Sequence, residues 1–156
     1  EYLYRLYLDN ELATNRFPVD GKLVRLSDIS VPMFVVGTET DHVAPWKSVY
    51  KVDNLVRSDD LTFLLTSGGH NAGIISGPVH PKRHYRVHTR RLRDPHLAPQ
   101  EWFDAALEQD GSWWPAWQQW LVQQSSKQQV KPPAMGAARK GYGVIEDAPG
   151  RYVRQR

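Results

Sequence analysis

The chain of 156 residues contains no cysteine and only two methionines. Without cysteine, these residues hold no disulfide framework, no thiolate zinc site and no thiol nucleophile. No apolar run approaches the roughly 20 residues that a membrane-spanning helix needs, and the N-terminal residues lack the layout of a signal peptide. We therefore expect a soluble, cytoplasmic protein with no transmembrane segment.

The residues that are present are enough for one domain, since 40% are hydrophobic and six are tryptophan. The net charge of +3 is mildly basic, and most of the excess lies in residues 82–93 and in the tail after Lys127. We interpret the basic segment 82–93 as a solvated loop, with no specific nucleic-acid partner. The first residue is Glu1 and already falls inside an expected helix, so we expect a piece of a longer protein.

Apolar periodicity predicts an α/β protein. Two apolar runs of strand length flank a segment with helical spacing, which is the pattern of two parallel strands joined by a crossover helix. Two strands do not make a stable parallel sheet alone, so the rest of the sheet is expected outside the chain. The predicted strands are 33–37 and 61–66, and the predicted helices are 1–12, 46–56, 98–109 and 111–124.

Two boundaries follow from composition. Residues 1–124 are predicted to form the folded part, in which the tryptophans near residue 117 pack against a core. Residues 125–141 have linker composition, rich in Gln, Lys, Pro, Gly and Ala, and the remaining residues are expected to be extended. We therefore divide the chain into 1–124 and a linker-like tail, 125–156.

An aspartate and a histidine follow the two predicted strands. Asp41 comes after the first strand, and His70 follows the glycines that end the second. The carboxyl ends of parallel strands meet at one edge of a sheet, where α/β proteins hold their ligands and catalytic groups. Paired there, the carboxylate would fix the histidine tautomer and stabilise its protonated form. The alternative is that both residues belong to ordinary polar turns.

The order of these two residues also carries information. Acid followed by histidine is the chain order of α/β-hydrolases, in which the nucleophile comes first. No Gly-x-Ser-x-Gly elbow, and no cysteine version of it, occurs in the sequence. If Asp41 and His70 form a catalytic pair, the nucleophile is therefore expected upstream of Glu1.

Several motifs occur in a family-specific order, namely "YLDNEL", "VPMFVVGTETDHVAPWKSVY", "SGGHNAG", "GSWWPAWQQWL" and "APGRYV". Together they resemble the C-terminal part of polyhydroxyalkanoate synthases, most closely the class that polymerises short 3-hydroxyacyl units. The resemblance implies the last parallel strands, crossover helices and C-terminal helices of an α/β-hydrolase fold. It also implies an acyltransferase that moves (R)-3-hydroxyacyl groups from CoA to a polyester. In its Cys-His-Asp triad, the family's acid matches Asp41 and its histidine matches His70, while the cysteine lies upstream.

The same resemblance marks further residues. His42 belongs to the matched "DHVAPW" motif, and Asn71 stands where many family members have an apolar residue, so both are candidate pocket residues. Lys82 and Arg83 are candidate contacts to the phosphates of CoA, although a solvated loop is the preferred interpretation. No cofactor is expected, because the CoA thioester is a substrate.

No metal site is predicted. His80, His84 and His88 follow one another at helical spacing, which could place three imidazoles on one helix face. Pro81 interrupts that helix, and the neighbouring arginines would repel a cation.

The resemblance further implies partners and location for the whole enzyme. These are the missing N-terminal portion, a second copy in a homodimer, the polyester chain, and the surface of polyester granules. Two alternatives remain open at this point. One is an esterase or depolymerase of the same fold with an upstream serine nucleophile, and the other is a non-catalytic binding module.

Overall fold

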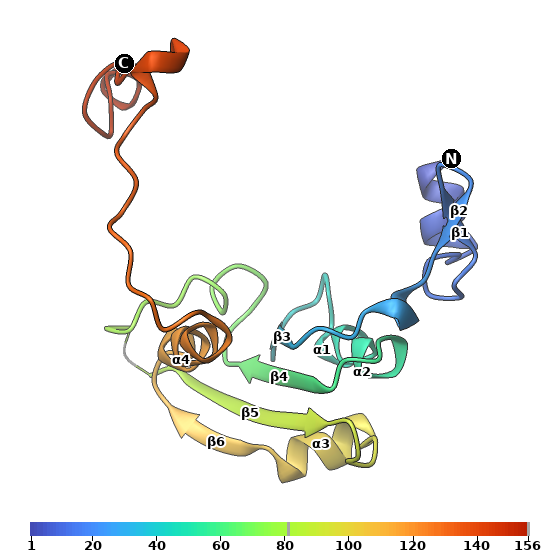
Figure 1. Cartoon of the computed structure of the whole chain (residues 1–156). Coiled ribbons are helices and arrows are strands. Elements are labelled where there is room, and N and C mark those ends of the chain that lie inside the picture. Colours follow the sequence, from blue (N-terminus) through green and yellow to red (C-terminus); the bar gives the residue numbers. More distant parts are fainter. Residues whose placement is uncertain (81, 156) are drawn as a thin grey trace. The chain divides into compact units, whose positions relative to one another are not determined.

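The computed structural model describes residues 1–80 and 82–155. Contacts within the chain define two units, Glu1–Ser125 and Ser126–Arg156. The second unit holds two short 3-10 helices, η3 (Ala138–Lys140) and η4 (Tyr152–Arg154). The first unit holds the four-stranded sheet (Figure 1).

The first unit begins with short elements and continues into a four-stranded mixed sheet. Strands β3 (Met33–Thr38) and β4 (Asp60–Thr66) run parallel, whereas β5 (His84–Arg91) and β6 (Leu107–Asp110) are each antiparallel to the strand before them. The order β3-β4-β5-β6 leaves β3 at one edge of the sheet. Before the sheet come the π-helix η1 (Leu3–Leu8), the hairpin strands β1 (Phe17–Val19) and β2 (Lys22–Val24), and the 3-10 helix η2 (Leu26–Asp28).

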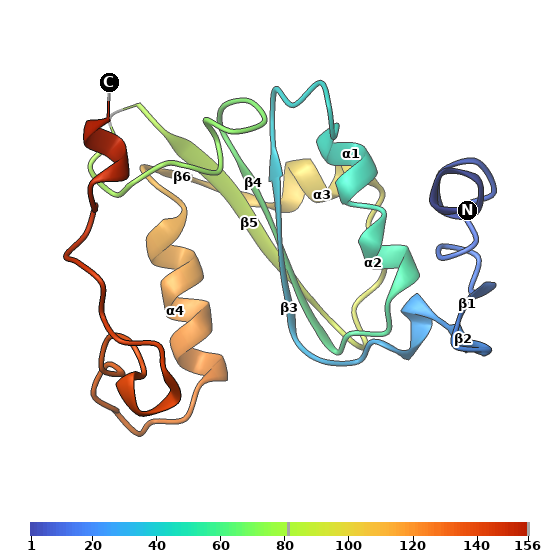
Figure 2. The same ribbon diagram turned by 90° about the horizontal axis from the view of Figure 1, so that it is seen from above.

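Helices cover both faces of the sheet (Figure 2). On one face, helices α1 (Trp46–Val49), α2 (Val52–Leu55) and α3 (Pro99–Ala105) enclose a core centred on Phe63 and Trp102. On the other face, α4 (Trp114–Gln124) packs near Leu64 and Tyr85. Because alternate residues of β4 enter the two cores, this strand is buried on both faces, as its continuous apolar run predicts.

The strand–helix–strand prediction is confirmed, with one difference in the connection. Both strands form as predicted and pair in parallel, with Met33 opposite Leu61 and Thr38 opposite Thr66. The single helix expected over 46–56 is instead two short helices separated by Tyr50 and Lys51. The fold is therefore α/β with a mixed sheet.

The basic segment is not a solvated loop, so this prediction is wrong. Residues His84–Arg91 form β5, which lies between β4 and β6. Tyr85 and Val87 face the core near α4, while the residues that alternate with them are histidines and an arginine. Alternation with period two is a strand signal, and on this strand Arg86 and Arg90 bond to Ala106 and Asp53 on the face covered by α2 and α3.

The third predicted helix is shorter than expected. Helix α3 ends at Ala105, four residues before the predicted end at residue 109, and Leu107–Asp110 pair with β5 as strand β6. The helix predicted over 111–124 is confirmed as α4, which begins at Trp114 with Pro115 in its first turn. In the part of the chain that the structure describes, no helix combines the length and apolar character needed to cross a membrane.

Candidate active site

The ends of β3 and β4 bring Asp41 and His70 together. Backbone pairing continues beyond the two strands, since the Glu39 N–H donates to the Thr66 carbonyl at 3.0 Å and the Thr40 N–H donates to the Gly68 carbonyl at 3.1 Å. This extension holds the two loops side by side at the carboxyl edge of the parallel strands. Asp41 Oδ2 then lies 2.9 Å from His70 Nδ1.

A glycine permits the two loops to approach. A Cβ atom on Gly73, which follows the His70 turn, would lie 2.6 Å from Thr38 Cγ2 and 3.1 Å from the Ser67 carbonyl oxygen. Since no side chain fits at such distances from a β-branched residue and backbone, the contact requires glycine at this position. The "GGHNAG" sequence thus contributes close packing as well as the histidine.

The Asp41 carboxylate is held mainly by neutral donors. Its Oδ1 accepts the backbone N–H groups of Val43 at 2.9 Å and Ala44 at 2.8 Å, and its Oδ2 accepts the Thr38 hydroxyl at 3.2 Å. This is the turn geometry in which an aspartate caps its own following residues. The Ala44 amide contributes most to lowering the pKa of Asp41 well below its usual value, and the bonds to His70, Val43 and Thr38 add to it, against an opposing effect of burial.

The two members of the pair differ in exposure. The Asp41 side chain is 8% exposed, whereas that of His70 is 48% exposed. A bond from Nδ1 to the carboxylate fixes the tautomer that leaves Nε2 as the atom for proton exchange. The arrangement is therefore a buried acid that orients an accessible base.

The other residues marked in the sequence differ in exposure and in contacts. His42 and Asn71 are the direct neighbours of Asp41 and His70 in the chain, and both are exposed. Lys82 is exposed, with a positive φ of 59°. Arg83 points inward, because its guanidinium donates to the carbonyls of Ser67 at 3.3 Å and Ala72 at 3.0 Å. Contact of Lys82 and Arg83 with CoA phosphates stays a prediction.

The histidines at 80, 84 and 88 do not share a helix face. His84 and His88 lie on β5, and His84 Nε2 is 3.2 Å from Glu39 Oε2. Among the described residues, no group of three or more His, Cys, Asp or Glu side chains gathers closely enough to hold a metal ion.

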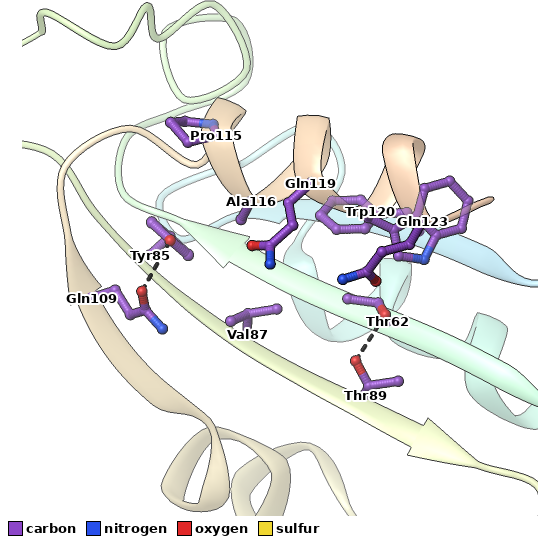
Figure 3. Close-up of a pocket in the computed structure, with 11 residues that line it drawn as sticks. Thr62, Tyr85, Val87, Thr89, Gln109, Pro115, Ala116, Gln119, Trp120 and Gln123 are labelled. Carbon is purple, nitrogen blue, oxygen red and sulfur yellow. Dashed lines mark hydrogen bonds between the residues drawn. The ribbon is translucent and has the colours of Figure 1, made fainter. Parts of the chain in front are cut away.

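A cleft of about 350 Å³ lies between α4 and the sheet (Figure 3). Along its walls, the Thr62 and Thr89 hydroxyls are 2.8 Å apart, and the Tyr85 hydroxyl donates to Gln109 Oε1 at 3.1 Å. Burial raises the pKa of Tyr85. The lining carries no formal charge and includes neither Asp41 nor His70, which makes the cleft chemically unlike a phosphate site. The lining residues are Phe34, Thr62, Tyr85, Val87, Thr89, Gln109, Pro115, Ala116, Gln119, Trp120 and Gln123.

The sequence reasoning missed a second aspartate–histidine pair. Asp53 on α2 lies with Oδ2 2.5 Å from His96 Nδ1 and with Oδ1 2.5 Å from Arg90 Nε. The Asp53 side chain is only 2% exposed. A charge buried at position 53 of an amphipathic segment is a signal that a partner must exist, but the signal does not identify that partner.

Fold and site together define an α/β protein that presents an Asp-His pair at the carboxyl edge of parallel strands. A scan against protein-family models finds no match. The chain is nevertheless similar to the poly(3-hydroxyalkanoate) polymerase subunit PhaC of Cupriavidus necator, with 38% identity over 154 residues, which cover 98% of this chain and 25% of the polymerase. The corresponding subunit of Rhizobium etli is 36% identical over 99% of this chain and 23% of the polymerase. The poly(3-hydroxyalkanoate) polymerase of Methylorubrum extorquens is 32% identical over 99% of this chain and 24% of the polymerase.

These similarities extend over almost every residue of the chain and confirm the resemblance noted in its motifs. The chain belongs to the poly(3-hydroxyalkanoate) polymerase family. It spans about a quarter of the length of the curated relatives that it matches.

Proposed function

We propose that the chain supplies the acid–base pair of a polyester polymerase, as the C-terminal part of its α/β-hydrolase-fold catalytic domain. The reaction is transfer of (R)-3-hydroxyacyl groups from CoA to a growing polyhydroxyalkanoate chain. The observation that carries the proposal is the 2.9 Å contact between Asp41 Oδ2 and His70 Nδ1, at a sheet edge suited to catalysis. The nucleophile is a cysteine thiol of a segment upstream of these residues.

In the first half-reaction, His70 acts as the base. Its Nε2 takes the proton of the thiol, and the thiolate attacks the carbonyl carbon of the acyl-CoA thioester. The bond from that carbon to the CoA sulfur breaks, and the departing sulfur takes the proton from His70. Asp41 stabilises the imidazolium while it carries this proton, which fits a carboxylate whose pKa is lowered by backbone amides.

In the second half-reaction, a 3-hydroxyl group attacks the enzyme-bound acyl group. The hydroxyl proton passes to His70 Nε2 as the oxygen attacks the acyl carbon, and the bond to the cysteine sulfur breaks. The sulfur recovers a proton from His70, and the polyester has grown by one unit. The same pair therefore accepts and returns the proton in both half-reactions.

The partner that supplies the nucleophile has a natural docking point on the sheet. Strand β3 has only β4 as a neighbour within the described residues, so its other edge offers unpaired backbone groups along "MFVVGT". These side chains are apolar and uncharged up to Thr38, which favours continuation of the sheet. We place the missing N-terminal portion of the polymerase at this edge, and expect the whole enzyme to form a homodimer and to bind the granule surface.

Specific observations favour this proposal over its alternatives. A serine esterase could use the same Asp-His pair, but the relatives at 38% and 36% identity are named as polymerases. A binding module would use the cations of the basic segment, and two of these are already paired within the sheet, since Arg86 lies 2.5 Å from Glu108 and Arg90 lies 2.5 Å from Asp53.

The test measures CoA release from 3-hydroxybutyryl-CoA by this chain alone and by a polymerase that contains it after a cysteine-bearing segment. We expect no turnover by the chain alone. In the polymerase, His70→Ala and Asp41→Ala should each lose far more activity than His42→Ala, the matched control from the same motif. Turnover by the isolated chain, or equal losses in the three variants, would contradict the proposal. Full activity after Cys→Ser exchange of the nucleophile would favour the esterase-like alternative.

A further inference from the structure

The loop that carries His70 is held by side chains from elsewhere in the chain. It runs from Ser67 to Ser76, directly after β4, and several of its backbone carbonyls accept side-chain hydrogen bonds rather than strand or helix bonds. The donors are Arg83, which directly precedes β5, and three residues that lead from β6 into the start of α4, namely Ser112, Trp113 and Trp114. This loop is therefore held by two separate anchors, one that spans the turn around His70 and one that binds the residues after that turn.

Arg83 forms the first anchor. Its Nη1 donates to the Ser67 carbonyl at 3.3 Å and its Nη2 donates to the Ala72 carbonyl at 3.0 Å, so one guanidinium ties together the two ends of the turn that contains His70. The planar fork of arginine suits such a double contact, whereas lysine offers a single ammonium group.

Gly68 makes room for the Arg83 side chain. A Cβ at Gly68 would lie 2.5 Å from Arg83 Nη1 and 3.1 Å from the Gly73 nitrogen, and the residue has a φ of +103°. Both the close approach and the backbone conformation favour glycine. The turn is thus shaped around the guanidinium as well as closed by it.

The "GSWW" sequence forms the second anchor. Ser112 Oγ donates to the Ser76 carbonyl at 2.5 Å, Trp113 Nε1 to the Gly73 carbonyl at 3.0 Å, and Trp114 Nε1 to the Ile74 carbonyl at 2.9 Å. Ser112 and Trp113 are 7% and 6% exposed, so their bonds are sheltered from water. These tryptophans were expected only to pack against a core, but their indole N–H groups also hold the loop.

We propose that Arg83 is a positioning residue for His70, assisted by the indole N–H groups of Trp113 and Trp114. This inference rests on the proposed role of His70 as a base. Asp41 fixes the imidazole from one side through Nδ1, but it does not fix the backbone that carries the ring. Arg83 closes that backbone turn, so that Nε2 is presented at a constant position. A displacement of about 1 Å at a reacting group can cost about 100-fold in rate.

The test compares Arg83→Gln and Arg83→Lys in the cysteine-bearing polymerase that contains this chain. For Arg83→Gln we expect kcat to fall by about 10- to 100-fold with little change in KM for the acyl-CoA. Arg83→Lys should recover part of the loss, because an ammonium group can still reach one carbonyl. The control is Arg86→Gln, at an arginine within β5 that donates to the Ala106 carbonyl at 3.1 Å, away from His70. It should leave kcat and KM within about two-fold.

A split between kcat and KM separates positioning from substrate binding. If Arg83 instead contacts a CoA phosphate, Arg83→Gln will raise KM and leave kcat unchanged, and the inference is overturned. A second pair of variants tests the same inference if Arg83→Gln does not fold. Trp114→Phe keeps an aromatic side chain but removes the N–H that reaches Ile74, and should lower kcat by several-fold. Trp117→Phe, one helical turn away, is its control and should match the parent polymerase.

NMR of the chain itself separates this inference from the proposed function. The Cε1–H resonance of His70, assigned with His70→Gln, should move in Arg83→Gln and stay in place in Arg86→Gln. If that resonance moves while His70→Ala leaves polymerase turnover intact, positioning stands and the proposed function fails. If neither the resonance nor kcat changes in Arg83→Gln, the positioning role is wrong, whatever the result for His70→Ala.

Discussion

Among the described residues, two aspartate–histidine pairs share one contact and differ in the groups that surround the carboxylate. In both, a carboxylate Oδ2 meets a histidine Nδ1, at 2.9 Å for Asp41 and His70 and at 2.5 Å for Asp53 and His96. Asp41 is otherwise surrounded by backbone amides and a hydroxyl. Asp53 also binds Arg90, so its charge already has a permanent cationic partner.

The environments therefore favour different tasks. Among the described residues that bond to the Asp41 carboxylate, the one cation would be protonated His70, so the carboxylate is placed to stabilise protonation of an accessible imidazole. At Asp53, the arginine neutralises the carboxylate, and the pair ties α2 to β5 and to the segment before α3. Burial is the first cause that raises the pKa of the neighbouring Tyr50 to about 12, and the charge of Asp53 is the second. An aspartate–histidine contact is thus a catalytic candidate only when no other cation already neutralises the carboxylate.

The largest difference between the pairs should appear in turnover. In a polymerase that contains this chain, we expect Asp41→Asn to lower kcat by about 10,000-fold, because the amide would favour the wrong histidine tautomer. Asp53→Asn should cost far less activity in the fraction that remains folded. Steady-state CoA release, normalised to folded protein by circular dichroism, measures both. Comparable losses in the two variants would remove the functional distinction between the pairs.

For the free energy of unfolding, we expect the larger loss in Asp53→Asn and the smaller loss in Asp41→Asn. Asp53→Asn leaves Arg90, whose side chain is 16% exposed, without its carboxylate, and breaking such a pair costs about 3–5 kcal/mol. Asp41→Asn should lower the free energy of unfolding by clearly less, since the loop lies at the sheet edge. Urea unfolding of the chain, followed by tryptophan fluorescence, gives both values. A larger loss for Asp41→Asn would mean that its pair is chiefly structural.

The sequence predicted one pair and missed the other for a physical reason. Asp41 and His70 follow two apolar runs whose parallel pairing needs only a local crossover, so their meeting follows from topology. Asp53 meets its partners only because β5 returns antiparallel to β4. That strand was hidden, because its arginines and histidines alternate with Tyr85, Val87 and Thr89 and raise the apparent polarity of the segment.

The hydrogen-bonding tryptophans were missed for a related reason. Helical spacing places Trp113 and Trp117 on an apolar stripe, and periodicity reports only that a face is buried. The direction of an indole N–H depends on which loop lies next to it, and the loop Ser67–Ser76 reaches this position through tertiary contacts. Periodicity thus located the core but not the bonds that anchor the His70 loop.

Acid titration should show which hydrogen bonds stabilise the Asp41 carboxylate. Its folded-state pKa is lowered, so its stabilising contribution is present above its unfolded value of about 4 and is lost as the pH falls below that value. The stability of the parent chain should fall below about pH 4, and this fall should be smaller in Asp41→Asn. His70→Gln should keep most of this fall, because the Ala44 amide lowers the pKa of Asp41 more than His70 does. Urea midpoints measured from pH 5 to about pH 2 test this, and matching curves for the two variants would assign the shift to His70.

The smallest expected effect concerns the Thr38 hydroxyl, which donates to Asp41 Oδ2 at 3.2 Å. Thr38→Val keeps the shape and removes one long hydrogen bond, worth about 1 kcal/mol or less, so kcat should fall by less than about ten-fold. The pKa of Asp41 should rise relative to the parent, since a donor to the carboxylate is lost. The matched control is Thr62→Val on β4, whose hydroxyl is paired with Thr89 on the face covered by α4. If both variants lower kcat equally, the loss reflects general repacking of the sheet, and the hydroxyl has no particular part in holding the acid of the Asp41–His70 pair.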